Sequence, residues 1–234
     1  MLASLVVLLL QSAPAQQGIN ARAITRAVTT KDALPPPAAS TSPVREWGLT
    51  GPNAVAYEIS IDSEVRHGGR QSAVIRCIPE ACDSFGTIGQ TIRAGTFRGK
   101  RIRLSAWVRS LHAGRANLWL RVDGFTAAFS KAQTGNRPVL DFDNMEDRVM
   151  TGTHDWTLQE IVLDVPHSAA LIYAGLILDG GGQAWLDDVA LEPVDPSVRR
   201  TTTYHKRNGR EGSNWEILTL AKFPKTIQNA GFEQ

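Results

Sequence analysis

Two stretches decide the fold of this chain: Arg101-Ile-Arg-Leu-Ser-Ala-Trp-Val-Arg109 and Ala116-Asn-Leu-Trp-Leu-Arg-Val-Asp123. In each, apolar side chains alternate with polar or aromatic ones, which is the two-residue period of a β-strand with one buried face. If the two strands lie in one sheet, their outer faces form a single surface. We call it the Trp107/Trp119 face, and its outward residues would be Trp107, Trp119, Arg103, Arg121 and Asp123.

The strand signal recurs along the chain, between turns rich in glycine such as Gly180-Gly-Gly182. Only a weak helical period is present, around residues 215–223. Strands without helical interludes predict an all-β protein, a two-sheet antiparallel sandwich that is most economically a jelly roll. The predicted strands cover residues 56–61, 72–77, 86–92, 100–109, 116–123, 139–144, 157–165, 170–179 and 184–192.

The first residues resemble an export signal. Residues 2–10 are an apolar run too short to span a bilayer, and Ser-Ala13-Pro-Ala15 after it resembles a cleavage site. We therefore predict a signal peptide at 1–16, no transmembrane span, and a secreted or periplasmic protein. No Lys or Arg precedes the apolar run, so an unusual cytosolic N-terminus and a short uncleaved anchor are the alternatives.

The flanks of the predicted sandwich differ in composition. Residues 17–45 are rich in Pro and Ser and predict a disordered linker, and residues 46–195 hold the jelly roll. Residues 196–234 form an irregular basic tail, of which residues 196–214 are interpreted as solvated, with a stripe for an anionic polymer as the alternative. The net charge of +2 gives no support for a nucleic-acid partner.

Cys77 and Cys82 are the only cysteines. In an exported chain we expect them to form a disulfide across the short intervening loop, and two free thiols are the alternative. A structural zinc site is not expected, because two cysteines without companion ligands are too few.

Six segments, in order along the chain, resemble the galactose-binding-like jelly-roll module related to carbohydrate-binding modules. Similar modules stand beside tail-specific serine peptidases and other domains in bacterial multidomain proteins. The resemblance implies a β-sandwich over residues 47–195. The segments are Glu64-Val-Arg-His-Gly-Gly-Arg-Gln-Ser-Ala73, Phe97-Arg-Gly-Lys-Arg-Ile-Arg-Leu-Ser-Ala-Trp-Val-Arg109, Leu118-Trp-Leu-Arg-Val-Asp-Gly124, Phe142-Asp-Asn-Met145, Gly152-Thr-His-Asp-Trp156 and Ala184-Trp-Leu-Asp-Asp-Val189.

The chain departs from the family in two places. An Asn-x-Gly-Phe-Glu segment normally opens the module as its first strand, whereas here Asn229-Ala-Gly-Phe-Glu233 closes the chain. It could begin a second copy, supply the missing strand from the C-terminus, or mark a disrupted reading frame. Residues 125–137 also form a longer connection than the family suggests, at a rim where ligand contacts are common.

Trp107 and Trp119 are the ligand candidates, because an indole face stacks on the apolar face of a sugar ring. Arg103, Arg121 and Asp123 would then bond the sugar hydroxyls. The alternatives are packing roles for both tryptophans and surface ion pairs for the charged residues.

The resemblance also implies a structural calcium ion. Asp187 and Asp188 stand where related jelly rolls hold Ca²⁺, with oxygens from the loop at 67–71 and the family's first-strand Glu, which corresponds here to Glu233. The alternative is that Asp187 or Asp188 accepts hydrogen bonds from the neighbouring turn.

Catalysis is not expected. Residues 141–147 hold an acidic cluster, but the sequence shows neither the separation nor the desolvation of a catalytic pair, and nucleophile, metal-protease and phosphate-loop motifs are lacking. We predict a non-catalytic module that binds a glycan or cell-envelope saccharide weakly. The alternative is an accessory module for a partner protein or domain, or a fragment of a larger peptidase-type protein.

Overall fold

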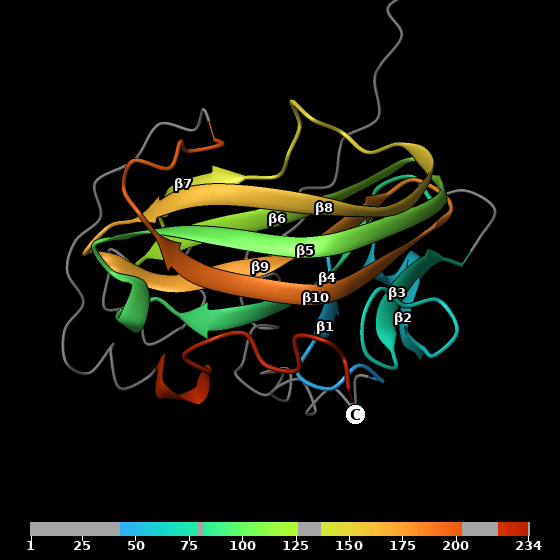
Figure 1. Ribbon diagram of the computed structural model, residues 1–234, viewed down its shortest axis with the longest axis horizontal. Helices are drawn as coiled ribbons and strands as arrows, with labels where there is room; N and C mark the ends of the chain where they lie inside the picture. The colour runs from blue at the N-terminus through green and yellow to red at the C-terminus, as the bar shows by residue number, and fades with distance from the viewer. Residues whose placement is uncertain (1–42, 79–81, 126–136, 203–219, 234) are drawn as a thin grey trace, which may run out of the picture. The chain divides into compact units, whose positions relative to one another are not determined.

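The computed structural model describes residues 43–78, 82–125, 137–202 and 220–233. Ten strands form two five-stranded antiparallel sheets, which confirms the predicted all-β sandwich (Figure 1). The strands are β1 (Gly48–Thr50), β2 (Tyr57–Asp62), β3 (Ser72–Cys77), β4 (Phe85–Arg93), β5 (Lys100–Ala113), β6 (Arg115–Gly124), β7 (Val139–Asp143), β8 (Gly152–Val165), β9 (Ala169–Asp179) and β10 (Gln183–Val194).

Every predicted strand is present, with ends shifted by a few residues, and β1 is an additional short strand that the sequence analysis missed. The described residues hold three 3₁₀ turns besides: η1 (Ala54–Ala56), η2 (Gly95–Phe97) and η3 (Leu220–Lys222). No helix in these described ranges is long and apolar enough to cross a membrane. The predicted leader and most of the predicted linker, residues 1–42, lie outside the described residues.

One sheet has the strand order β1-β4-β9-β6-β7 and contains Trp119, so we call it the Trp119 sheet. The other has the order β2-β3-β10-β5-β8 and contains Trp107, so we call it the Trp107 sheet. The core lies between them, where the inward residues of the long strands β5 and β6 are fully buried or nearly so. These residues include Ile102, Leu104, Val108, Leu118, Leu120 and Val122.

The chain passes from one sheet to the other between β5 and β6. Gly114 alone joins the two strands, and a Cβ there would lie 2.4 Å from the carbonyl oxygen of Asp179. His112, two residues earlier, has a φ of 52°. The close approach and the unusual backbone turn the chain at this point, so β6 pairs with β9 and β7 instead of β5.

The Asn229-Ala-Gly-Phe-Glu233 segment packs against the sandwich. The Phe232 side chain is fully buried, with its ring centroid 5.1 Å from that of Trp47. The backbone N–H of Val189 donates to the carbonyl of Ala230 over 3.0 Å. The segment thus completes the core from the C-terminal part of the chain, as turns and not as the first strand the family motif suggests, and Figure 1 shows it below β1.

The described parts of the predicted basic tail are also held. Arg101 Nη1 donates to the carbonyls of Pro196 and Val198, and Arg200 Nη2 contacts the fully buried carboxylate of Asp141 at 2.7 Å. Residues 196–202 are thus held by specific contacts, although none of them is buried. Residues 203–219 lie outside the described ranges.

The predicted disulfide between Cys77 and Cys82 is confirmed. It closes the turn that follows β3, and residues 79–81 within that turn lie outside the described residues.

Candidate functional site

The two tryptophans do not share a face. Trp107 lies on β5 and Trp119 on β6, and these strands belong to different sheets. Both side chains alternate with buried neighbours, so each projects from the outer surface of its own sheet. The predicted Trp107/Trp119 face is therefore wrong: Arg103 lies in the Trp107 sheet, whereas Arg121 and Asp123 lie in the Trp119 sheet.

A loop covers Trp107. The imidazole of His67 stacks on the indole, with ring centroids 3.9 Å apart and planes 14° apart, and Trp156 meets the imidazole edge-on at 5.8 Å. The carboxylate of Asp188 holds His67 in place through a 2.8 Å contact to Nδ1. Trp107 thus packs under the loop that contains His67 and offers a ligand little free ring area.

A buried carboxylate anchors that loop. Asp187 is fully buried and accepts hydrogen bonds from the backbone N–H groups of His67, Gly68 and Asp188, at 2.8–3.1 Å. Burial raises the pKa of Asp187, and these hydrogen bonds oppose the shift. On the same sheet Arg103 pairs with Glu192 at 2.7 Å and with Glu160 at 3.3 Å, which matches the surface ion pairs given as its alternative.

Trp119 lies along its sheet. Its indole N–H donates to Thr87 Oγ1 on β4 over 2.7 Å, so the side chain reaches from β6 across β9. Glycines occupy the two positions that it crosses: a Cβ on Gly175 would lie 2.9 Å from the indole nitrogen, and one on Gly89 would lie 3.5 Å from Cζ2. Because no side chain intervenes, one ring face rests on the backbone and the other points outward.

Tyr173 continues this surface. Its ring is nearly parallel to that of Trp119, with planes 16° apart and centroids 6.5 Å apart, and the Arg121 guanidinium lies 5.6 Å from the centre of the Tyr173 ring. Burial raises the pKa of the Tyr173 phenol, and the nearby Asp123 carboxylate adds to the shift. The phenol therefore stays protonated at neutral pH and can donate a hydrogen bond.

Arg121 and Asp123 form a bidentate pair, with both N–O distances 2.6 Å. Asp123 is 1% exposed whereas Arg121 is 38% exposed. Burial raises the pKa of Asp123, and the Arg121 guanidinium opposes that shift. The carboxylate thus orients the guanidinium, and Arg121 is the member of the pair that solvent or a ligand reaches.

We call Trp119, Tyr173 and Arg121, with Gly89 and Gly175 beneath them, the Trp119 platform. It presents two flat rings and a planar cation on the outer surface of one sheet. Such a surface can stack on an apolar ring face and donate hydrogen bonds at its edge.

Calcium does not fit the residues predicted to hold it. Asp187 uses its carboxylate oxygens on backbone N–H groups, and Glu233 uses its own on the backbone and side chain of Arg70. Ca²⁺ needs six to eight oxygen ligands. Within the described ranges, no group of three or more His, Cys, Asp or Glu is arranged to hold a metal. The alternative, that Asp187 bonds the neighbouring turn, agrees with the structure.

The acidic cluster at 141–147 is committed to structural contacts. Asp143 pairs with Arg148 at 2.7 Å and accepts a hydrogen bond from the backbone N–H of Met145 over 2.8 Å. Asp141 is paired with Arg200. Asp143, Glu146 and Asp147 also line a cavity of about 200 Å³, where Asn144 Nδ2 donates to Glu146 and Arg148 pairs with Asp147.

Tyr173, Gly89 and Gly175 were not predicted as site residues from the sequence. Residues 169–179 are apolar on both faces, so alternation does not show which side chains point outward. A signal was nevertheless present, because a glycine inside a strand marks close approach of another group. Gly89 and Gly175 are such glycines, and they are paired with each other in the neighbouring strands β4 and β9.

No family model matches the chain. An uncharacterized HTH-type transcriptional regulator of Bacillus subtilis (strain 168), YbfP, is 37% identical over 160 residues, which are 68% of this chain and 51% of that protein. The chain thus spans about half the length of this curated relative. The residues that the structure describes contain 3₁₀ turns and no α-helix, so a recognition helix is not among them.

Among solved structures, the enzymatically active domain of tailspike protein 4 of bacteriophage CBA120 is 16% identical, with a TM-score of 0.47, over 64% of this chain and 20% of that one. The CBM22-1 xylan-binding domain of Paenibacillus barcinonensis Xyn10C is 12% identical, with a TM-score of 0.45, over 64% of this chain and 87% of that one. The C-terminal family 22 carbohydrate-binding module of Clostridium thermocellum Xyn10B is 13% identical, with a TM-score of 0.44, over 67% of this chain and 90% of that one.

Proposed function

We propose that this protein is a non-catalytic module that binds a glycan on the Trp119 platform. The single observation that carries the proposal is the position of the Trp119 ring, which lies across Gly89 and Gly175 and is stacked with the ring of Tyr173. Arg121 stands at the edge of the platform, where it can donate to sugar hydroxyls.

The chemistry of the platform suits a sugar better than it suits a hydrophobic peptide. A pyranose ring has an apolar face that matches an indole and a rim of hydroxyls that needs hydrogen-bond partners. The platform alternates flat rings with the Arg121–Asp123 pair, and it exposes no large aliphatic side chain; the exposed ones among the described residues are Val55, Ile78, Val149 and Leu158. The platform is therefore expected to prefer a polar, ring-shaped ligand.

An exported location is part of the proposal. A Cys77–Cys82 disulfide forms and persists in an oxidising compartment, and the predicted signal peptide at 1–16 and linker at 17–45 would place the jelly roll there. A secreted or periplasmic glycan, such as a cell-envelope polysaccharide, is accordingly the expected partner.

Affinity gel electrophoresis against a panel of polysaccharides tests the proposal. The wild-type protein is expected to be retarded by at least one of them, and Trp119→Ala is expected to weaken retention about tenfold or more, because about 1.4 kcal/mol of lost stacking is a factor of ten. Trp107→Ala is the matched control and should keep retention, since His67 covers Trp107.

Circular dichroism must show both variants folded. Equal loss in the two variants would contradict the assignment to the Trp119 sheet. Absence of retention by any glycan would reject the proposed function in favour of a module that docks a partner protein. Turnover of a glycan or a peptide by the purified protein would show that the module is an enzyme.

A further inference from the structure

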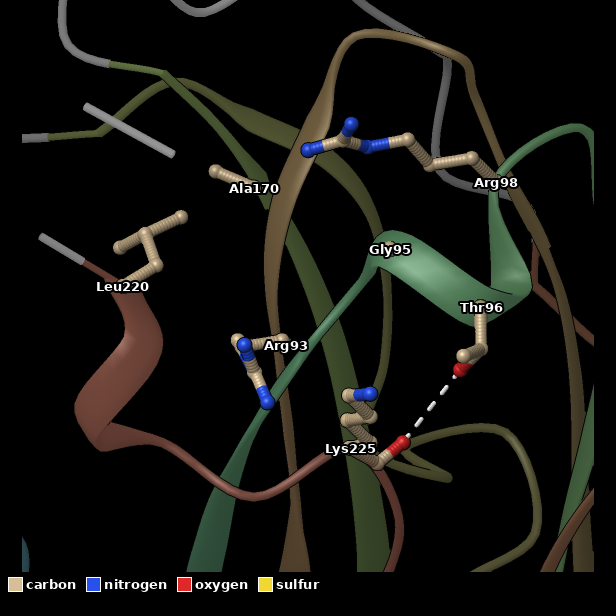
Figure 2. A pocket seen from close by; sticks show the side chains of 7 residues that line it. All are labelled: Arg93, Gly95, Thr96, Arg98, Ala170, Leu220 and Lys225. Atoms are coloured by element: carbon tan, nitrogen blue, oxygen red, sulfur yellow. Dashed lines mark hydrogen bonds between the residues drawn. The ribbon is translucent and has the colours of Figure 1, made fainter. Parts of the chain in front are cut away.

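A second feature of the Trp119 sheet is a cavity of about 250 Å³ at the end of β4 (Figure 2). Figure 2 shows Arg98 above the cavity, Arg93 and Lys225 below it, and Leu220 and Ala170 at one side. Among the described residues, its lining contains three cationic side chains and no acidic one. These lining residues are Arg93, Gly95, Thr96, Arg98, Ala170, Leu220 and Lys225.

The cations are held together by the backbone. The N–H of Arg93 donates to the carbonyl of Pro224 over 2.8 Å, which fixes the neighbouring Lys225 beside β4. Thr96 Oγ1 donates to the carbonyl of Lys225 over 3.4 Å. On the opposite side, Arg98 Nε donates to the carbonyl of Ala169 over 2.7 Å, and its guanidinium carbon lies 5.3 Å from the Phe125 ring centre.

Arg93 lacks the partners that other arginines of this protein have. Its Nε is buried without a hydrogen-bond partner. The same is true of Nε in Arg115 and Arg200, but those guanidiniums pair with Asp179 and Asp141 through Nη2. Among the described residues, no carboxylate pairs with Arg93 or Lys225.

Two neighbouring cations without an acid repel each other, and a buried donor without an acceptor is destabilising. An oxyanion in the cavity removes both costs, because it brings negative charge and several acceptor oxygens. A guanidinium binds carboxylate, sulfate and phosphate through paired N–H donors, and Lys adds a point charge. Buried Leu220 and Ala170 form an apolar wall on one side of the cavity.

The cavity lies in line with the Trp119 platform. Arg93 follows Thr91 on the same strand face, and Thr91 is paired with Tyr173 in the register of β4 and β9. Arg93 is four residues beyond Gly89, which supports the Trp119 ring, and at about 3.3 Å per residue this is roughly 13 Å along the strand. A chain of sugars lying on the rings would therefore reach the cations.

We infer that the cavity formed by Arg93, Arg98 and Lys225 is an oxyanion site, and that the glycan on the Trp119 platform is an acidic one. The acidic character of the glycan rests on the proposed glycan function. The oxyanion site does not, because it is inferred from the geometry of the cavity alone. The recognised group is a carboxylate or a sulfate ester carried by a sugar.

Titration calorimetry with free sulfate and with free galacturonate tests the anion site without any polymer. Both are expected to bind the wild-type protein. Arg93→Gln is expected to weaken binding about tenfold or more, and Lys225→Gln several-fold, with a fall in affinity as salt rises. Lys222→Gln is the matched control, because Lys222 is a nearby cation that does not line the cavity.

Polymer binding separates the two proposals. Polygalacturonate is compared with neutral galactan, and dextran sulfate with dextran, so that the arms distinguish carboxylate from sulfate. We expect the acidic polymer of one pair to bind more tightly, with a preference lost in Arg93→Gln and Lys225→Gln but kept in Lys222→Gln. Binding of the neutral polymers alone would overturn the acidic preference and leave the proposed function intact.

Two other outcomes are decisive. Binding of free anions without binding of any polymer would support the oxyanion site and reject the glycan function. No binding of free sulfate or galacturonate, or binding unchanged in both cavity variants, would overturn the oxyanion site. Because Arg93 is part of a strand and its variant could unfold, the exposed Lys225 provides the second, independent variant.

Discussion

The outer surfaces of the two sheets each carry a tryptophan at an equivalent outward position, and they differ in what lies over the ring. On the Trp107 sheet, a loop anchored by Asp187 places His67 on the indole at 3.9 Å. On the Trp119 sheet, the indole lies on two glycines and turns its other face outward. The same residue in the same strand pattern thus serves packing on one sheet and can serve recognition on the other.

The difference has a local cause. The Trp107 ring lies beside the loop that contains His67. The buried carboxylate of Asp187 accepts hydrogen bonds from the backbone N–H groups of His67, Gly68 and Asp188 and so holds that loop in place. The Trp119 ring lies across two strands that have glycine at the contact positions, so no side chain at those positions separates the ring from the backbone. Substitutions at Gly175, Asp187, Asp123 and Arg70 test this contrast.

Gly175→Ala should remove the support of the Trp119 ring. Its Cβ would lie 2.2 Å from the carbonyl oxygen of Ile88, which belongs to the neighbouring strand backbone and cannot move aside cheaply. We expect a loss of about 3 kcal/mol in the free energy of unfolding, measured by urea denaturation. Ser105→Ala, on the outer surface of the Trp107 sheet, is the control and should change it by less than about 0.5 kcal/mol. Equal losses of stability in the two variants would show that Gly175 is not required beneath the Trp119 ring.

Asp187→Ala should release the loop that covers Trp107. Three backbone N–H groups would lose their acceptor in a buried place, and we expect a loss of about 2 kcal/mol together with faster amide exchange at His67 and Gly68. Asp155, which is 86% exposed, provides the comparison, and Asp155→Ala should leave both quantities nearly unchanged. Unaltered exchange in Asp187→Ala would show that other contacts hold the loop.

Asp123→Asn should change the pH dependence of stability more than stability itself. Burial raises the pKa of Asp123 above its unfolded value of about 3.9, so its contribution is fully present below that value and is lost as pH rises through the folded pKa. As pH falls from 7 toward 4, the wild type should therefore gain stability relative to Asp123→Asn, by less than about 1 kcal/mol. Urea midpoints at several pH values give the difference. A relative gain with rising pH would contradict the assigned direction.

The smallest effect concerns the other end of the covering loop. Hydrogen bonds from the backbone and then the side chain of Arg70 lower the pKa of Glu233. The stability that this contact adds is present above the unfolded pKa of about 4.3 and is lost as pH falls through the folded value. An NMR titration should find the Glu233 carboxyl below its ordinary range, and Arg70→Ala should bring it back. An unchanged titration in Arg70→Ala would reject the contact.

Much of the fold could be predicted from the sequence, because alternation is a local property. It predicted strands at 100–109 and 116–123, which the structure extends to Lys100–Ala113 and Arg115–Gly124, and it identified their inward residues correctly. The pairing of Cys77 with Cys82 followed from the short separation and an expected exported location. The family resemblance also indicated that Glu233 belongs near Asp188 and the 67–71 loop, and the contacts of Glu233 and Ala230 agree with that placement.

The candidate site was only half predictable. Trp119, Arg121 and Asp123 were named from alternation, but they were joined to Trp107 and Arg103, which belong to the other sheet. Tyr173 was missed because both faces of β9 are apolar, and Arg93 and Lys225 were missed because they meet only through contacts between residues more than a hundred positions apart.

The sequence by itself determined which side chains of each strand point inward, since a period of two residues requires no knowledge of the neighbours. Which sheet a strand joins was decided only by the tertiary structure. The single residue Gly114 turns the chain so that β5 pairs with β8 and β10 while β6 pairs with β9 and β7, and those pairings depend on burying both inner faces together. Alternation is a property of one strand, and sheet membership is a property of several strands that are distant in sequence.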